Sequence, residues 1–243
     1  MRLTAELIRD SLSYLNPLKE RELDLRGHRI PAIENLGAAG PHDAIDFTDN
    51  DIQVLGNFPL SPRITTLLLA RNRVASIQPA LAAAVPNLRN LVLASNHLVE
   101  LADVDALGAL GRLTHLVLAD NPVAKKEHYR YWVIWRCPSV RFLDYEKVKQ
   151  AERDQARELF GTEEEPTALA TSIMGKKSKL EVTANGSSAA PSKLSRIKLT
   201  DAEKQRLQER IKKATSLQEI IALEKELNEG RLPSGVYGDA MEE

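Results

Sequence analysis

The chain has 243 residues, of which 43% are hydrophobic and 28% are charged, enough for one well-buried domain with additional segments. Its 33 Lys and Arg residues balance 34 Asp and Glu residues, for a net charge of -1, which argues against a polybasic protein that binds nucleic acid by charge alone. The single Cys137 excludes an internal disulfide framework and suits a reducing compartment, and no apolar stretch of about 18 residues predicts a membrane span.

The N-terminus predicts a short amphipathic helix over residues 4–15. Thr4 is placed to cap it, and one face carries Leu7, Ile8, Leu12 and Leu15. Pro17 prevents its continuation. Glu6 comes early and no apolar run follows, so a secretory signal is not expected and the protein is expected to be intracellular. Because the repeats that follow expose an apolar end, this helix is the candidate N-terminal cap.

One sequence pattern then recurs five times: an apolar-x-apolar strand, an asparagine and another apolar residue. The copies span residues 23–30, 45–52, 67–74, 91–98 and 116–123, and the asparagine slot falls at 28, 50, 72, 96 and 121, in steps of 22, 22, 24 and 25. Units of roughly 20–29 residues with this pattern are typical of a leucine-rich repeat. Stacked units build a continuous core and a parallel sheet, so we predict an α/β, right-handed leucine-rich-repeat solenoid with a curved parallel sheet and caps over residues 1–160.

The asparagine slot predicts a ladder of side chains bonded to backbone groups where each strand ends. His28 occupies the first slot, and its ring nitrogens are able to do part of that work. We interpret it as a terminal-repeat variant rather than a ligand. In the return segments, Ala80–Val85 and Val104–Leu110 predict helical turns on the outer side.

The side chains between the buried strand positions point onto the concave face of the sheet. In chain order these are Asp24, Asp46, Leu68, Val92 and Val117, and the neighbouring outward positions are Arg26, Thr48, Ala70, Ala94 and Ala119. This face begins acidic and polar and ends small and apolar. Apolar side chains facing solvent indicate a binding surface, and the alanines leave room for a helix. The alternative is that aliphatic residues merely suit strands. The predicted partner-binding residues are Asp24, Arg26, Asp46, Thr48, Leu68, Val92 and Val117.

After the repeats, an aromatic run from Lys125 to Arg136 predicts a helix that Pro138 ends. With Val140 and Leu143 it would close the solenoid. The aromatic cluster is interpreted as core and cap, with a base-stacking platform as the alternative. Cys137 beside it is expected to be a buried apolar side chain.

A charged helix is predicted over residues 144–160, either as a solvated surface or as a phosphate contact through Lys149 and Arg153. Composition predicts a flexible linker over residues 161–198, with a weak import signal at Lys176–Lys179. Two capping boxes, beginning at Thr200 and Ser216, predict a helical hairpin within residues 199–243, able to dock on the solenoid or on a partner.

Motifs that carry catalysis are not found. The chain has no Gly-rich phosphate loop, H-E-x-x-H, C-x-x-C or G-x-S-x-G. Its five histidines are scattered along the sequence, and its acidic pairs fall in predicted turns, where aspartate is common for backbone reasons. We therefore expect neither an enzyme nor a cofactor or metal site.

Particular segments resemble the A-prime family of the U2 small nuclear ribonucleoprotein (snRNP). The resemblance lies in residues 21–31, 33–38, 43–50, 121–123, 128–130 and 140–144, within a match over about residues 3–160, and in the Leu-Pro-Ser-Gly end. His28 departs from the family, where a tyrosine is usual, and the outward repeat residues differ in detail.

The resemblance implies a non-catalytic spliceosomal protein of the nucleus. It implies a concave face that holds a helix of an RNA-recognition-motif protein of the B-double-prime type, which binds a stem-loop of U2 snRNA, alongside other spliceosomal proteins and no membrane. Arg26, Lys149 and Arg153 are the RNA-contact candidates by position near the ends of the arc. Two other classes stay open at this point: a general leucine-rich-repeat scaffold, and an acidic nuclear chaperone, whose long acidic tail this chain lacks.

Overall fold

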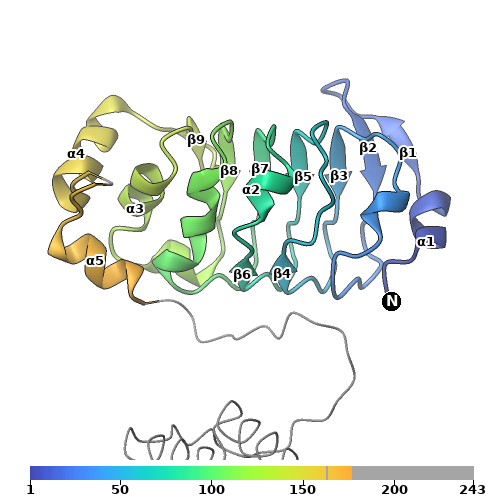
Figure 1. The fold of residues 1–243 in the computed structure, drawn as a ribbon, viewed down its shortest axis with the longest axis horizontal. Coiled ribbons are helices and arrows are strands. Elements are labelled where there is room, and N and C mark those ends of the chain that lie inside the picture. The colour runs from blue at the N-terminus through green and yellow to red at the C-terminus, as the bar shows by residue number, and fades with distance from the viewer. Residues whose placement is uncertain (163, 177–243) are drawn as a thin grey trace, which may run out of the picture. The chain divides into compact units, whose positions relative to one another are not determined.

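The computed structural model describes residues 1–162 and 164–176, all within the first of the chain's two units, Met1–Ala184. These residues stack as a leucine-rich-repeat solenoid, with strands along one face and short helices along the other (Figure 1). The predicted α/β repeat fold with a cap at each end is confirmed.

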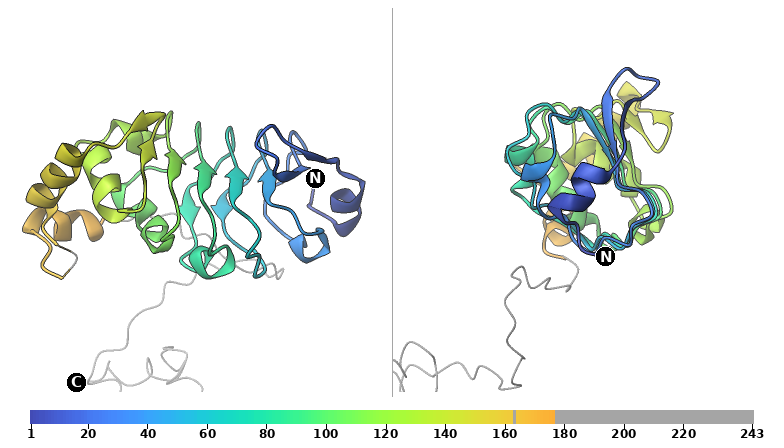
Figure 2. Two further views of the ribbon diagram at one scale, coloured as in Figure 1. Left: turned by 90° about the horizontal axis from the view of Figure 1, so that it is seen from above. Right: turned by 90° about the vertical axis from the view of Figure 1, so that its right-hand side faces the viewer.

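Short strands build an eight-stranded sheet in the order β1-β2-β3-β5-β7-β8-β9-β10. Each of the five repeats supplies one strand, β2, β3, β5, β7 or β8, and the two ends add β1, β9 and β10. The six inner strands run parallel, and β1 and β10 pair antiparallel at the two ends. Their bounds are β1 Ser13–Leu15, β2 Arg21–Asp24, β3 Ala44–Asp46, β5 Thr66–Leu68, β7 Asn90–Val92, β8 His115–Val117, β9 Phe142–Leu143 and β10 Glu146–Lys147. The left view in Figure 2 shows these strands side by side along the solenoid, and the right view looks along the stack, so that the repeats overlap.

The core lies between the sheet and the return segments. Leu67 and Leu69 of one repeat are fully buried, as are Leu91 and Leu93 of the next. Because successive side chains of a strand point to opposite faces, these residues fill the interior and leave the position between them on the concave face. Stacking repeats therefore converts a two-residue alternation into one continuous apolar interior.

The predicted asparagine ladder is confirmed for four of the five slots. The Asn72 amide nitrogen donates to the carbonyl oxygens of Phe47, at 2.9 Å, and Leu69, at 3.2 Å, and its oxygen accepts from the Ile52 amide at 3.1 Å. Equivalent bonds surround Asn50, Asn96 and Asn121. In the first slot, Nδ1 of His28 is buried and has no hydrogen-bond partner among the described residues, so the ladder begins at Asn50.

One left-handed residue turns the chain immediately before each slot. Its φ is 71° at Gly27, 64° at Asp49, 52° at Arg71, 55° at Ser95 and 60° at Asp120. Only the first repeat places glycine here, where a residue with a Cβ pays a steric cost. The same backbone conformation recurs because it directs the side-chain amide of each asparagine back to the carbonyl oxygen three residues earlier in its own repeat.

The opposite side of the solenoid carries shorter elements. They are the two-stranded parallel sheet of β4 (Val54–Leu55) and β6 (Ser76–Ile77), and the helical turns η1 (Leu36–Ala38), α2 (Leu81–Ala84) and η2 (Leu101–Ala109). The helical turns predicted at residues 80–85 and 104–110 are therefore confirmed.

The N-terminal helix is shorter than predicted. Helix α1 spans Ala5–Asp10 and is capped by Thr4, whose hydroxyl accepts from the Leu7 amide at 3.2 Å. Leu12 and Leu15 are 71% and 69% exposed rather than on a buried helical face. The chain leaves the helix at Ser11 because strand β1 finds hydrogen-bond partners on β2, which a longer helix would forfeit.

The C-terminal cap also differs from the prediction in its boundaries. A 3-10 turn, η3, spans Pro122–Lys125, and helix α3 begins only at Tyr129 and ends at Arg136, because His128 before it is left-handed with φ of 62°. Helix α4 spans Gln150–Phe160 rather than residues 144–160, since residues 142–147 form the closing hairpin of β9 and β10.

The predicted linker does not begin at residue 161. Helix α5, Ala168–Met174, follows α4; Ala170 is fully buried, and Ile173 and Met174 pack against the core. The Thr167 amide donates to the Phe160 carbonyl at 3.0 Å, which returns the chain onto the cap. The rest of the predicted linker, the basic run beyond Lys176 and the hairpin predicted within residues 199–243 lie outside the described residues.

Candidate functional site

The outward strand positions form one straight row across the concave face. Strand register aligns Asp24 with Asp46, Asp46 with Leu68, Leu68 with Val92, and Val92 with Val117. Leu68 and Val92 are half-buried, whereas Val117 is only 7% exposed. Val117 is thus more covered than its sequence position predicted, and Leu68 and Val92 supply most of the accessible apolar surface.

A second row runs beside the first, one outward position further along each strand. It consists of exposed Arg26 followed by half-buried Thr48, Ala70, Ala94 and Ala119. The alanine side chains are short, so the surface beside Leu68 and Val92 is recessed. The two rows together offer a shallow apolar strip at one end and a polar region at the other.

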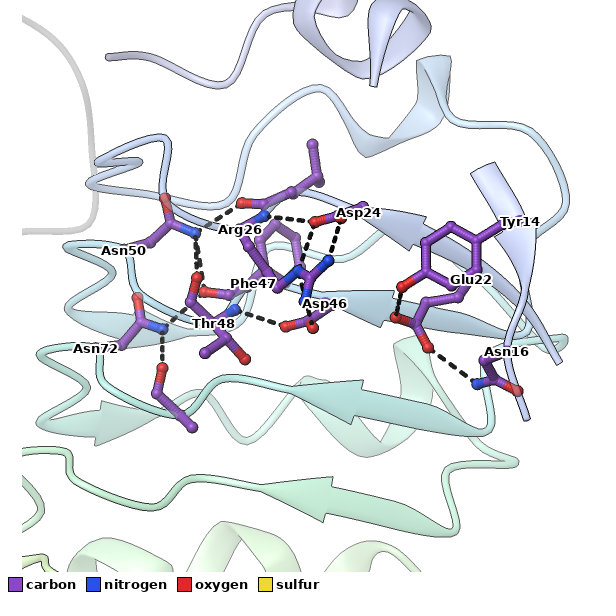
Figure 3. A network of polar contacts seen from close by, with 12 residues as sticks. Tyr14, Asn16, Glu22, Asp24, Arg26, Asp46, Phe47, Thr48, Asn50 and Asn72 are labelled. Atoms are coloured by element: carbon purple, nitrogen blue, oxygen red, sulfur yellow. Dashed lines mark hydrogen bonds and ion pairs between the residues drawn. The ribbon is translucent and has the colours of Figure 1, made fainter. Parts of the chain in front are cut away.

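The polar region is an internally paired charge cluster (Figure 3). The Arg26 guanidinium donates to Asp24 at 2.9 Å and lies 3.6 Å from the Asp46 carboxylate, which in turn accepts from the Thr48 amide at 2.8 Å. The hydrogen bond from Arg26 holds the pKa of the Asp24 carboxyl below its usual range. Arg26 is therefore held against the face by two carboxylates instead of reaching outward.

The β1–β2 hairpin adds residues to this face that the sequence did not predict. The Tyr14 hydroxyl donates to Glu22 at 2.8 Å, and the Asn16 amide donates to Glu22 at 2.9 Å (Figure 3). The bond to Glu22 raises the pKa of the Tyr14 phenol. Residues 4–15 were predicted to be one helix, so a strand beside β2 was missed; the turn residues Asn16 and Pro17 were the available signal.

Glu20 extends the polar cluster along the entry side of the strands. Its carboxylate accepts from the hydroxyls of Thr65, at 2.8 Å, and Thr66, at 3.0 Å. Thr66 in turn accepts from the Asn90 amide at 2.9 Å. This chain of side-chain bonds runs from the residue before β2 to β5 and β7, and it orders the polar end of the face.

The predicted RNA-contact residues are not brought together. Arg26 follows β2 near one end of the sheet, whereas Lys149 and Arg153 follow β10 at the other. The Arg153 guanidinium donates to the carbonyl oxygens of Pro138, at 2.9 Å, and Val140, at 2.6 Å. Of the three, Lys149 has an exposed side chain that the described contacts leave outside any ion pair.

The aromatic residues of the C-terminal cap belong to its core. Trp132 is fully buried, its ring lies 5.1 Å from that of Phe160, and its indole nitrogen donates to the Leu101 carbonyl at 2.9 Å. Burial raises the pKa of the Cys137 thiol to about 12, in agreement with its predicted apolar role. The described residues hold no group of three His, Cys, Asp or Glu that would suit a metal ion, and no helix among them is both long and apolar enough to cross a membrane.

A solenoid of this kind with a recessed face defines a leucine-rich-repeat protein, and a family model described as a leucine-rich repeat matches residues 1–174. The chain is 71% identical to the U2 small nuclear ribonucleoprotein A′ of Neurospora crassa over 100% of both chains. It is 41% identical to the human protein of that name, over 100% of this chain and 96% of the human one. The chain belongs to the U2 small nuclear ribonucleoprotein A′ family.

A solved structure has the same fold. The crystal structure of the Drosophila melanogaster SNF/U2A′ complex matches with a TM-score of 0.65 and 46% identity, covering 68% of this chain and 95% of that chain. The matched relative was therefore crystallised together with a protein partner.

Proposed function

We propose that this protein is a non-catalytic, nuclear component of the U2 snRNP in pre-mRNA splicing. Its concave face holds an RNA-recognition-motif protein of the B-double-prime type and helps that partner bind a U2 snRNA stem-loop. The observation that carries the proposal is the row of Leu68 and Val92, aligned in register beside a row of alanines.

The shape of the face suits a helix. A helix with its side chains is about 10–12 Å across, and strands lie about 4.8 Å apart, so a docked helix covers two or three repeats. Burying the remaining surface of Leu68 and Val92 contributes at most about 0.5–1 kcal/mol each, since both are already half-buried. The short side chains of Ala70 and Ala94 let the helix backbone approach.

The relatives support a protein partner. The names of the curated relatives place them in the U2 snRNP, and the matched Drosophila chain was solved as a complex with SNF. The polar end of the face, where Asp24, Arg26 and Asp46 are paired, then sets the register of the partner rather than its affinity, because paired charges contribute specificity more than binding energy.

The test is the double substitution Leu68→Glu with Val92→Glu. Two carboxylates on the apolar strip would be buried unpaired by the partner, so partner affinity without RNA, measured by isothermal titration calorimetry, should fall by at least about 100-fold. Circular dichroism should be unchanged, since both positions face away from the core.

The matched control is Leu18→Glu with Leu60→Glu. Both leucines are exposed, at 71% and 75%, and lie off the apolar strip. This variant should bind the partner as the unsubstituted chain does. Unchanged affinity of the Leu68/Val92 variant with an intact fold would contradict the concave-face proposal, and co-purification of other proteins alone, with or without ribonuclease, would favour a general scaffold.

A further inference from the structure

One rim of the concave face carries arginines without acidic neighbours. Backbone bonds align Arg89, Thr114 and Arg141 at the entry to successive strands: the Thr114 amide donates to the Arg89 carbonyl at 2.9 Å, and the Arg141 amide donates to the Thr114 carbonyl at 2.8 Å. Arg112 precedes Thr114 by two residues. All three arginine side chains are exposed.

Three exposed arginines of the preceding repeats are instead paired with aspartates. Arg63 lies 2.9 Å from Asp43, Arg73 lies 3.0 Å from Asp51, and Arg71 lies 3.7 Å from Asp49. Across the part of the chain that the structure describes, Arg89, Arg112 and Arg141 have no such ion pair and no side-chain hydrogen bond. Their surroundings explain this, because residues 86–99, 110–119 and 138–143 contain no Asp or Glu.

An aromatic pair and a lysine lie in the adjoining row. Strand register aligns Asn90 with His115, His115 with Phe142, and Phe142 with Lys147. The His115 and Phe142 rings are stacked, with centroids 4.8 Å apart and planes 1° from parallel. Phe142 is 37% exposed, and His115 and Lys147 are exposed as well.

We propose that this basic rim, formed by Arg89, Arg112, His115, Arg141, Phe142 and Lys147, binds RNA. The arginines and Lys147 contact backbone phosphates, and the stacked pair offers an aromatic surface to a base or ribose. The inference rests on the proposed function for the presence of RNA, and it locates the RNA on the β7–β9 rim rather than at Arg26 or Arg153.

The chemistry of the rim favours RNA over an acidic peptide. Guanidinium groups bind phosphate through two parallel N–H donors. Adjacent strands lie about 4.8 Å apart, and the long arginine and lysine side chains can extend from that spacing to reach successive phosphates. Exposed aromatic rings between cations recur in surfaces that bind single strands and loops, where bases stack on them. A carboxylate ligand would gain nothing from the stacked pair.

The test neutralises the arginines in the complex with the partner. The triple variant Arg89→Gln, Arg112→Gln, Arg141→Gln is titrated with fluorescently labelled U2 snRNA stem-loop at several salt concentrations. RNA affinity should fall by about tenfold or more, and the slope of log affinity against log salt should shrink by about 0.7–0.9 for each lost phosphate contact. Partner affinity without RNA should not change.

The matched control is Arg9→Gln, Arg29→Gln, Arg157→Gln. These residues are also exposed, and the variant carries the same change in net charge, so it separates local contact from overall charge. If both triple variants bind the stem-loop with the affinity and salt slope of the unsubstituted complex, the basic rim does not bind RNA. Failure of the unsubstituted chain to bind the partner would instead refute the proposed function.

Phe142→Ala tests the aromatic part, with Tyr145→Ala as control because Tyr145 is 77% exposed and is outside the stack. Only Phe142→Ala should weaken stem-loop binding, by about fivefold or more, since one stacked base contributes about 1–3 kcal/mol. Polyglutamate is the competing probe. If it displaces the stem-loop at equal charge concentration, or if Phe142→Ala binds normally, the rim is a site for acidic polymers and the RNA assignment is wrong.

Discussion

At the scale of single residues, the ladder asparagines hydrogen-bond the backbone where each strand ends and so join neighbouring repeats. Each amide satisfies groups of two neighbouring repeats that no strand pairing reaches, as Asn72 does for Phe47, Leu69 and Ile52. Buried backbone groups left without partners are costly. A short polar side chain is needed because both its donor and its acceptor are used within one turn.

Asn72→Ala should therefore lower the free energy of unfolding by about 3 kcal/mol. It leaves the buried Ile52 amide without its partner, and it removes one of the two side-chain amides that donate to each of the Phe47 and Leu69 carbonyl oxygens. Urea denaturation followed by circular dichroism measures this. Asn87→Ala is the control: Asn87 makes one bond, to the Pro62 carbonyl at 2.7 Å near the surface, and its loss should cost less than about 1 kcal/mol. Equal costs would show that the ladder adds nothing to its repeat.

At the scale of elements, the two ends of the solenoid are capped by different structures. The N-terminal end uses α1 and a strand added antiparallel to β2, and the C-terminal end uses α3, α4 and α5. Arg130 of α3 donates from its Nε atom to Oε1 of Glu152 of α4 at 2.6 Å. This bond holds the pKa of the Glu152 carboxyl below its usual range. Helix α5 completes this cap.

Ala170→Asp tests the contribution of α5. Ala170 is fully buried, so an aspartate there places a charge without a partner in the cap. The free energy of unfolding should fall by about 2–4 kcal/mol, measured by urea denaturation. Ser172→Asp, on the exposed side of the same helix, should change the free energy of unfolding by less than about 0.5 kcal/mol. If Ala170→Asp costs as little as Ser172→Asp, α5 packs weakly against the cap.

At the scale of the described solenoid, each repeat contacts mainly its neighbours, so stability is approximately a sum over repeats and their interfaces. A defect in one cap should therefore act locally. Leu3, fully buried in the N-terminal cap, covers the first repeat, and its carbonyl accepts from Asn35 at 2.8 Å.

Leu3→Asp should speed amide exchange in β2 and β3 and leave β8 and β9 unchanged, as measured by hydrogen-exchange mass spectrometry, because local opening need not propagate along stacked repeats. Leu12→Asp, at a leucine 71% exposed, is the control and should change neither region. Faster exchange along all strands would show that the solenoid opens as a single cooperative unit.

The sequence by itself determined the repeats, the buried leucine rows, the asparagine ladder and the side of the sheet on which Leu68 and Val92 lie. These depend on a period of two within strands and on a near-constant repeat length, both of which are written in the residue order. The family was also evident from particular segments.

Tertiary structure alone decided which charges are free. Arg26 and Arg153 look available in sequence. Arg26, however, is held by Asp24 of its own repeat and Asp46 of the next, and Arg153 is held by two backbone carbonyls of the cap. Arg89, Arg112 and Arg141 carry no motif. They share one rim because the stacked strands align Arg89, Thr114 and Arg141, with Arg112 two residues before Thr114. Strand β1 forms where a longer helix was predicted because β2 offers it hydrogen-bond partners. Pairing across 20 or more residues depends on stacking, which no local pattern reports.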